Sequence, residues 1–281
     1  MEKWHIVVDI EKCVGCFNCM LACKDEHVGN KWLPYTDEQQ KHENKWINPE
    51  KHERGSVPFT EICFVPHMCQ HCDEAPCEKK FPDVVTKRPD GIVLLDVKKA
   101  KGKKELADAC PYGAIVWNEE LKTAQKCTLC AHLLDDGWTE PRCVQSCPLR
   151  ALSIVHCEDT EFEKLADKQN LKPITNGSNQ PRVLYKNLYK FNKVFVAGAL
   201  AFLDGDIEKA AVDARISLSL NGKKLLEQKA DFFGEFKFDK LPKNSGTFTV
   251  ECLMEGYNPI RQEVTVGNEC VKMELMTFEG R

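Results

Sequence analysis

The chain of 281 residues is long enough for about two domains, each with its own buried core. Its 39 basic and 43 acidic side chains give a formal net charge of -4, which disfavours the broad cationic surface typical of nucleic-acid-binding proteins. A chain of this length with 16 cysteines, 42% hydrophobic residues and no secretory leader does not resemble a disulfide scaffold. We therefore interpret most of the thiols as metal ligands.

No targeting or membrane segment is predicted. The only continuous apolar run before the first cysteine is Ile6–Val8, shorter than the roughly 7 to 15 residues of a signal-peptide core. The longest uncharged apolar stretch, Val194–Leu203, is well short of the roughly 20 residues that span a bilayer. We expect a cytoplasmic, soluble chain, although carriage across a membrane by a partner with its own signal is compatible with the sequence.

The first predicted element is a ferredoxin-type cysteine run beginning at Cys13. Its spacing, C-x2-C-x2-C-x3-C, is that of bacterial 4Fe-4S ferredoxins, in which the fourth cysteine of each run ligates the cluster of the other run. A matching run with a longer insertion begins at Cys127 and ends in Cys147-Pro148. Exchange of the fourth ligands predicts two clusters, one held by Cys13, Cys16, Cys19 and Cys147, and the other by Cys23, Cys127, Cys130 and Cys143.

The middle of the chain contains one complete and one missing ligand set. Phe81-Pro82 stands where a Cys-Pro is expected, and stepping back from Cys110-Pro111 by ferredoxin intervals reaches Leu106, Lys103 and Ala100. These four positions would have served one cluster, so a whole set is absent. The thiols that remain form a full set for a neighbouring cluster: Cys69, Cys72, Cys77 and Cys110.

The sequence therefore predicts three 4Fe-4S clusters, or about twelve iron atoms. Zinc is an open alternative for the Cys69/Cys72 pair taken alone, but four cysteines within eleven residues do not fit a zinc site. His67 and His71 flank that pair and are assigned a supporting or surface role. The thiols left over are interpreted as small buried hydrophobes: Cys63, Cys157, Cys252 and Cys270.

Basic residues near the ligands are a further feature of the cluster region. The positive charge of these residues would offset the negative charge of the clusters and raise the reduction potentials of the clusters. Any single one of these residues is also explained as a solvated surface side chain. The basic run from Lys98 is interpreted as a solvated helix start rather than a nucleic-acid site. The residues close to the ligands are Lys12, Lys24, Lys79, Lys80, Lys126 and Arg142.

The last third of the chain predicts a small β-sandwich. A helical stretch over residues 158–171 and a loop over 173–181 precede it. From Phe195 the sequence alternates between apolar and polar residues, with a hairpin turn at Asn221-Gly222. We expect an α+β chain, with a ferredoxin-like double 4Fe-4S cluster-binding domain over residues 1–194 and an all-β sandwich over 195–281.

Four ferredoxin-type runs in this order, with CPYGAI in the third and CVQSCPLRAL in the fourth, resemble the iron-sulfur electron-transfer subunits of the dimethyl sulfoxide reductase family. The segments KCTLCAHLLDDGW, PRVLYKNLYKF and DFFGEFKFD further resemble the β subunits of hydroxybenzene (pyrogallol-phloroglucinol) transhydroxylases over essentially the full length. That resemblance implies three clusters and a transthyretin-like, seven-stranded C-terminal domain. Most subunits of the wider family carry four clusters.

The resemblance implies a large catalytic α subunit that carries molybdopterin guanine dinucleotide with molybdenum or tungsten, in a heterodimer or a higher (αβ)n assembly. The present chain shows no catalytic residues of its own, and its implied role is to relay electrons to or from that partner. Alternatives are the same subunit in an aromatic dehydroxylase or hydroxylase, or in an oxyanion reductase. A third is a scaffold whose clusters only stabilise the fold.

Overall fold

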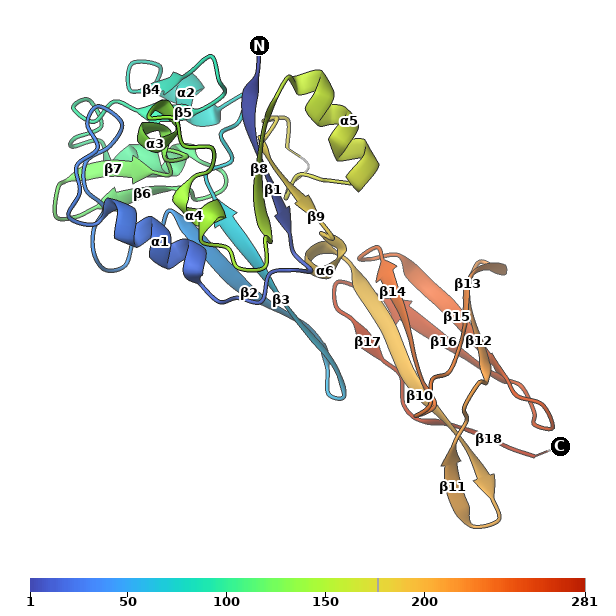
Figure 1. The fold of residues 1–281 in the computed structure, drawn as a ribbon. Helices are drawn as coiled ribbons and strands as arrows, with labels where there is room; N and C mark the ends of the chain where they lie inside the picture. The colour runs from blue at the N-terminus through green and yellow to red at the C-terminus, as the bar shows by residue number, and fades with distance from the viewer. Residues whose placement is uncertain (176, 281) are drawn as a thin grey trace. The chain divides into compact units, whose positions relative to one another are not determined.

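The computed structural model describes residues 1–175 and 177–280, which divide into two compact units (Figure 1). The first unit comprises Met1–Lys51 and Cys63–Leu188. The second comprises His52–Ile62 and the residues from Tyr189 onward. The expected loop over 173–181 contains no helix or strand in its described part, and position 176 lies outside the described residues.

The first unit is built around a three-stranded sheet of order β8-β1-β9. β1 pairs antiparallel with β8, from Lys3↔Cys157 to Val8↔Leu152, and parallel with β9. The side chains of β1 are buried from His5 to Asp9, because the strand is central in the sheet. α5 confirms the expected helix, and its Phe162 ring stacks on His5 at a centroid distance of 3.8 Å. The bounds are β1 Lys3–Asp9, β8 Leu152–Cys157, α5 Asp159–Gln169 and β9 Val183–Lys186.

Short elements fill the rest of this unit and carry most of the cysteines. The strands form three two-stranded sheets, β2-β3, β4-β5 and β6-β7, and α1 packs against α4. The bounds are α1 Asn18–His27, β2 Ile47–Ser56, β3 Phe59–Met68, α2 Pro76–Lys80, β4 Val85–Lys87, β5 Val93–Leu95, η1 Lys104–Ala109, β6 Ile115–Asn118, β7 Thr123–Lys126, α3 Ala131–Asp135 and α4 Arg142–Gln145. The tip of the β2-β3 pair, His52–Ile62, is grouped with the second unit.

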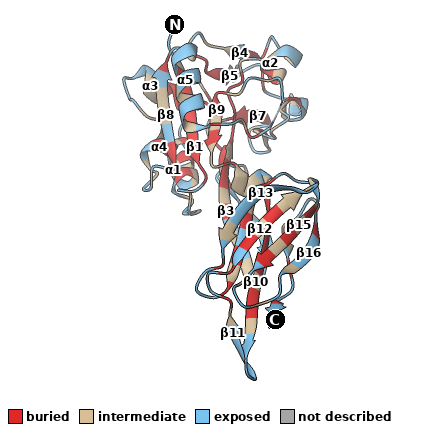
Figure 2. Ribbon diagram, turned by 90° about the vertical axis from the view of Figure 1, so that its right-hand side faces the viewer, coloured by how far each residue is buried: buried red, intermediate tan, exposed pale blue. Residues whose placement is uncertain are grey.

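The second unit contains two sheets that share one apolar core (Figure 2). One has the order β13-β12-β15-β16, and the other is built on β10 with β11, β14, β17 and β18. Asn221 and Gly222 both adopt positive φ between β12 and β13, which confirms the hairpin turn. The bounds are α6 Tyr189–Asn192, β10 Val194–Asp204, β11 Ile207–Ala210, β12 Arg215–Leu220, β13 Lys223–Lys229, β14 Glu235–Leu241, β15 Gly246–Leu253, β16 Ile260–Val266, β17 Val271–Lys272 and β18 Met276–Phe278.

The described part of this unit has more strands in its two sheets than the seven implied by the resemblance, with five in one and four in the other. The length of β10 explains the difference. Along one edge it pairs first with β14 and then with β11, and along the other first with β17 and then with β18. Each edge of one long strand is therefore covered by two short strands in succession.

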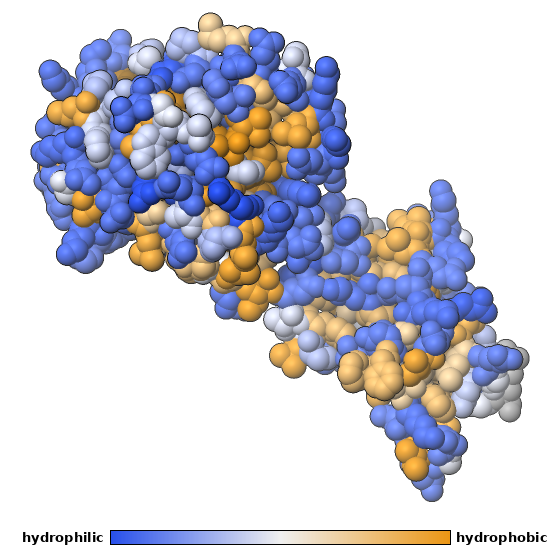
Figure 3. Space-filling model, viewed as in Figure 1, coloured by the Kyte–Doolittle hydropathy of each residue, from blue (hydrophilic) through white to orange (hydrophobic). Residues whose placement is uncertain are grey.

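The surface of both units is predominantly hydrophilic on the face drawn in Figure 3, with apolar patches between charged side chains. Val14 and Leu149 of the first unit are 60% and 49% exposed, and Phe232 of the second is 78% exposed. None of the helices in the described ranges is both long and apolar enough to cross a membrane.

Candidate iron-sulfur centres

The first predicted thiol set lies around the loop between β1 and α1. Cys13 and Cys16 lie on the loop, Cys19 is in the first turn of α1, and Cys147 follows α4. Burial raises the pKa of Cys19 to about 12, and the charges of Cys13, Cys147 and Cys16 raise it further. The charges of the other three sulfurs therefore act on Cys19, and all four cysteines line one pocket. Cys16 is the exposed member.

The second set has three buried members and a half-buried one, Cys127. It combines Cys23 of α1, Cys127 after β7, Cys130 at the start of α3, and Cys143 of α4. Burial holds the pKa of Cys143 well above its usual value, and the charges of Cys130, Cys127 and Cys23 add to the rise.

The packed pair α1 and α4 brings the first and second sets together. α1 carries Cys19 and Cys23 one turn apart, and Cys143 lies in α4 four residues before Cys147. Each helix region thus supplies a member to both sets. This arrangement is compatible with the exchange of fourth ligands, which stays a prediction.

The third set surrounds the loop after β3. Cys69 and Cys72 lie on the loop, Cys77 is in α2, and Cys110 follows η1. Burial raises the pKa of Cys72 to about 12, with further contributions from Cys69, Cys110 and Cys77. The members of this set thus lie on neighbouring segments, and the assignment of the twelve cysteines to three clusters stays a prediction.

Backbone N–H groups already point at several of these sulfurs. Ala114 N donates to Cys110 Sγ at 3.4 Å, and Ala151 N donates to Cys147 Sγ at 3.2 Å. Both donors lie four residues after the cysteine of a Cys-Pro, so the two segments fold alike around their sulfurs. Such bonds favour the thiolate, which is the form that binds iron.

Free buried thiols in groups of four fit iron-sulfur clusters. All 16 cysteines lie in the described part of the chain and none forms a disulfide. Deprotonating four adjacent buried thiols without a metal leaves mutually repelling charges in a low-dielectric site. Bound iron removes that penalty and is suited to a thiolate donor set.

Three of the four positions without thiols form part of an apolar core. Phe81, Ala100 and Leu106 pack in the same cluster as Val84 and Ile115, and Leu106 is fully buried. Lys103 is half-buried, and its carbonyl accepts the backbone N–H of Leu106 at 3.3 Å. The structure therefore brings three of the missing positions together, which is compatible with their assignment to one absent set.

The remaining cysteines and the two histidines lie outside the thiol sets. Cys63, Cys157 and Cys252 are buried in strands, and Cys270 Sγ accepts a bond from Phe195 N at 3.4 Å. His67 is half-buried. The ring of His71 is buried, and its Nδ1 accepts the backbone N–H of Val93 at 3.0 Å.

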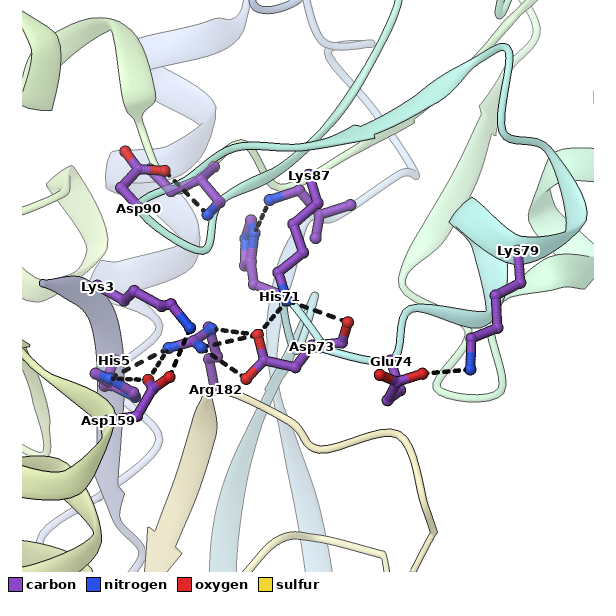
Figure 4. Close-up of polar contacts among 12 residues, drawn as sticks. Lys3, His5, His71, Asp73, Glu74, Lys79, Lys87, Asp90, Asp159 and Arg182 are labelled. Atoms are coloured by element: carbon purple, nitrogen blue, oxygen red, sulfur yellow. Dashed lines mark hydrogen bonds and ion pairs between the residues drawn. The ribbon is translucent and has the colours of Figure 1, made fainter. Parts of the chain in front are cut away.

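A buried ionic network beside the third set was not anticipated (Figure 4). Arg182, which precedes β9, donates to Asp73 at 2.6 to 3.0 Å, to Asp159 at 3.0 Å, and to His5 Nε2 at 3.2 Å. Asp73 directly follows Cys72 and also binds Lys87. The network thus ties the Cys72 loop to β1, β9 and α5. No sequence signal links these residues, because they are widely separated along the chain.

Comparison with known proteins assigns the chain to a family. A family model described as a 4Fe-4S dicluster domain matches residues 60–157. The small subunit of pyrogallol hydroxytransferase from Pelobacter acidigallici is 42% identical over 91% of this chain and 92% of its own length. A sulfite dehydrogenase subunit from Allochromatium vinosum is 35% identical over 57% of this chain and 72% of its own length.

Solved structures similar to this chain include the minor pilin GBS52 from Streptococcus agalactiae, with a TM-score of 0.26 and 14% sequence identity. The match covers 38% of this chain and 52% of the pilin chain. Klebsiella pneumoniae 5-hydroxyisourate hydrolase also gives a TM-score of 0.26, with 15% identity over 31% of this chain and 92% of that one. These scores are too low to assign a fold family.

Clustered thiols on a dicluster domain define the class of protein: the chain is a non-catalytic iron-sulfur electron-transfer subunit of an oxidoreductase complex, carrying 4Fe-4S clusters. Within that class, it belongs to the family that contains the pyrogallol hydroxytransferase small subunit. Membership in a family of small subunits implies a separate catalytic partner.

Proposed function

We propose that this chain relays electrons to or from the catalytic subunit of a molybdopterin-dependent hydroxybenzene transhydroxylase through three 4Fe-4S clusters. The observation that carries the proposal is that buried thiols of each proposed set raise one another's pKa, while Phe81, Ala100 and Leu106 pack in an apolar cluster at positions of a fourth set. The choice of enzyme is supported by 42% identity to a pyrogallol hydroxytransferase small subunit over 91% of the chain.

The assigned ligands are Cys13, Cys16, Cys19 and Cys147 for the first cluster, Cys23, Cys127, Cys130 and Cys143 for the second, and Cys69, Cys72, Cys77 and Cys110 for the third. A ferredoxin-like domain over 1–194 holds them, and a transthyretin-like sandwich follows over 195–281. Free thiols outside the sets, such as buried Cys252, suit a reducing, cytoplasmic setting.

Electron exchange with the partner is assigned to the first cluster. Its Cys16 is exposed, and the pocket lined by the four thiols of this set is also lined by Val14 and Leu149, which are 60% and 49% exposed. Exposed apolar side chains beside a buried redox group are suited to a protein interface. The partner would carry molybdopterin guanine dinucleotide with molybdenum or tungsten.

The ligand assignment is tested by iron and acid-labile sulfide analysis of the anaerobically purified complex. We expect about twelve irons per chain, and about eight in Cys110→Ser. Cys252→Ser is the control, because Cys252 is a fully buried free thiol that lies outside every set. A count of about eight or sixteen in the unaltered protein, or equal counts in the two variants, would contradict the assignment.

The reaction is tested by assaying the complex with pyrogallol and a hydroxylated benzene co-substrate, with and without an electron donor. Hydroxyl transfer between two hydroxybenzenes is redox-neutral overall, so turnover is expected without a stoichiometric donor. Absolute dependence on a donor would instead indicate a dehydroxylase or an oxyanion reductase. Reduction of the clusters by dithionite and reoxidation by substrate within the turnover time excludes a purely structural role.

A further inference from the structure

Lys126 is a buried cation between the second and third thiol sets. It is the last residue of β7, is 3% exposed, and directly precedes Cys127. Its Nζ donates to the carbonyl oxygen of Cys127 at 2.8 Å and to that of Val93. Within residues 1–175 and 177–280, no carboxylate forms an ion pair with it.

The other cations close to the ligands have different surroundings. Arg142 pairs with Glu26 at 3.2 Å and with Asp25, and Lys79 pairs with Glu74 at 2.5 Å. Lys24 is half-buried and donates to a backbone carbonyl, while Lys12 and Lys80 are exposed. Lys126 alone among these six described residues combines full burial with the lack of a carboxylate.

An ammonium group buried without a counter-charge costs several kcal/mol, and two carbonyl dipoles offset only part of that cost. Negative charge must therefore come from elsewhere. Thiols lie on both sides: Lys126 directly precedes Cys127 of the second set, and Val93, whose carbonyl oxygen accepts from Lys126, packs in one cluster with Cys72, Cys77 and Cys110 of the third set. Lys126 is not among the charges that shift the pKa of Cys13 or Cys19 in the first set.

We propose that the Lys126 ammonium is the shared counter-charge of the second and third clusters and raises the reduction potential of both. The inference rests on the proposed ligand assignment. Each one-electron reduction adds a negative charge to a cluster, and a fixed cation nearby stabilises the reduced state more than the oxidised state. Lys126 thus acts as a positioning charge that makes the reduction of either cluster more favourable, whereas an equal rise of both potentials leaves the free energy of electron transfer between them unchanged.

The test is a potentiometric titration of the intact anaerobic complex, followed by electron paramagnetic resonance. In Lys126→Met we expect the midpoint potentials of two clusters to become more negative by at least about 59 mV. For a one-electron couple this shift is a tenfold change in the equilibrium constant of reduction. The midpoint of the remaining cluster stays unchanged. Lys126→Arg, which keeps the charge, is expected to retain both midpoints.

The matched control is Lys122→Met, because Lys122 lies on the same hairpin but is exposed and pairs with Glu119 at 2.8 Å. It should leave all three midpoints in place. If Lys126→Met loses iron, Lys126→Gln, which can still donate to a carbonyl, replaces it with the same expected shift.

The inference would be overturned if Lys126→Met kept its full iron content and left all midpoint potentials unchanged, or shifted all three equally. Either result would leave the cluster assignment intact. Failure of the assignment itself is distinguishable, because the unaltered complex would then lack about twelve irons per chain before any variant is compared.

Discussion

Replacing Arg182 by leucine is expected to lower the free energy of unfolding of the first unit by about 2 to 3 kcal/mol. The guanidinium is 3% exposed and binds both Asp73 and Asp159. Removing one partner of a fully buried ion pair costs about 3 to 5 kcal/mol. We expect less here because the side chains of Asp73 and Asp159 remain 25% and 41% exposed, and each keeps a lysine partner.

The same substitution is expected to change the pH dependence of stability through His5. Burial, followed by the charge of Arg182, lowers the pKa of His5 to about 4. The unfolded chain takes up this proton near pH 6.5, so the folded state loses stability as the pH falls from 6.5 towards 4. Between pH 7.5 and 5.5 this one group contributes a loss of about 1.3 kcal/mol.

Without Arg182, the carboxylates of Asp159 and Asp73 raise the pKa of His5 with less opposition, so the loss should be smaller. The measurement is anaerobic urea unfolding of the full chain at both pH values, followed by far-ultraviolet circular dichroism. His5→Phe removes the titrating group while keeping an aromatic ring against Phe162, and it gives the baseline slope. Arg182→Leu with wild-type stability at pH 7.5, or with the wild-type pH slope, would refute this reasoning.

Two further predictions concern glycines with positive φ. Gly15→Ala is expected to reduce the iron content by about four per chain. The φ of Gly15 is +67°, and a Cβ there would lie 2.5 Å from the Phe64 ring. Gly29→Ala is the control for the iron analysis, because Gly29 also has a positive φ but faces open space. Gly234→Ala places a Cβ 2.3 Å from Leu200 O, and should cost about 1 to 3 kcal/mol in urea unfolding. Gly222→Ala, which has open space, should cost less, and equal losses would contradict the steric argument.

Local signals in the sequence predicted those features whose cause is itself local. The hairpin turn at Asn221-Gly222 requires two residues that tolerate positive φ, and both adopt it. The iron-sulfur character of the chain was predictable because cluster geometry restricts the spacing of ligands within a run, as it does from Cys13 to Cys23. Neither inference required knowledge of distant contacts.

Features that depend on distant contacts could not be predicted in this way. The β2-β3 pair was missed because β2, with the sequence INPEKHERGS, is charged and lacks an alternating apolar pattern. Within the second unit its Arg54 binds Asp239 at 2.8 Å and also pairs with Glu61, so tertiary ion pairs support the strand. The network around Arg182 is similar, since its partners come from separate segments of the chain.

The complete replacement of one ligand set has a physical reason in the burial of these sites. If only one of four thiols were lost, the other three would remain in a site where burial raises the pKa, as it raises that of Cys77 to about 11. They would stay protonated, hold no complete cluster and bury little apolar surface. Larger apolar residues at these positions gain burial energy, as does Leu106, which is 0% exposed. Stability thus favours a full set or none, and this explains how the third set stays complete beside an apolar core that includes Phe81 and Ala100.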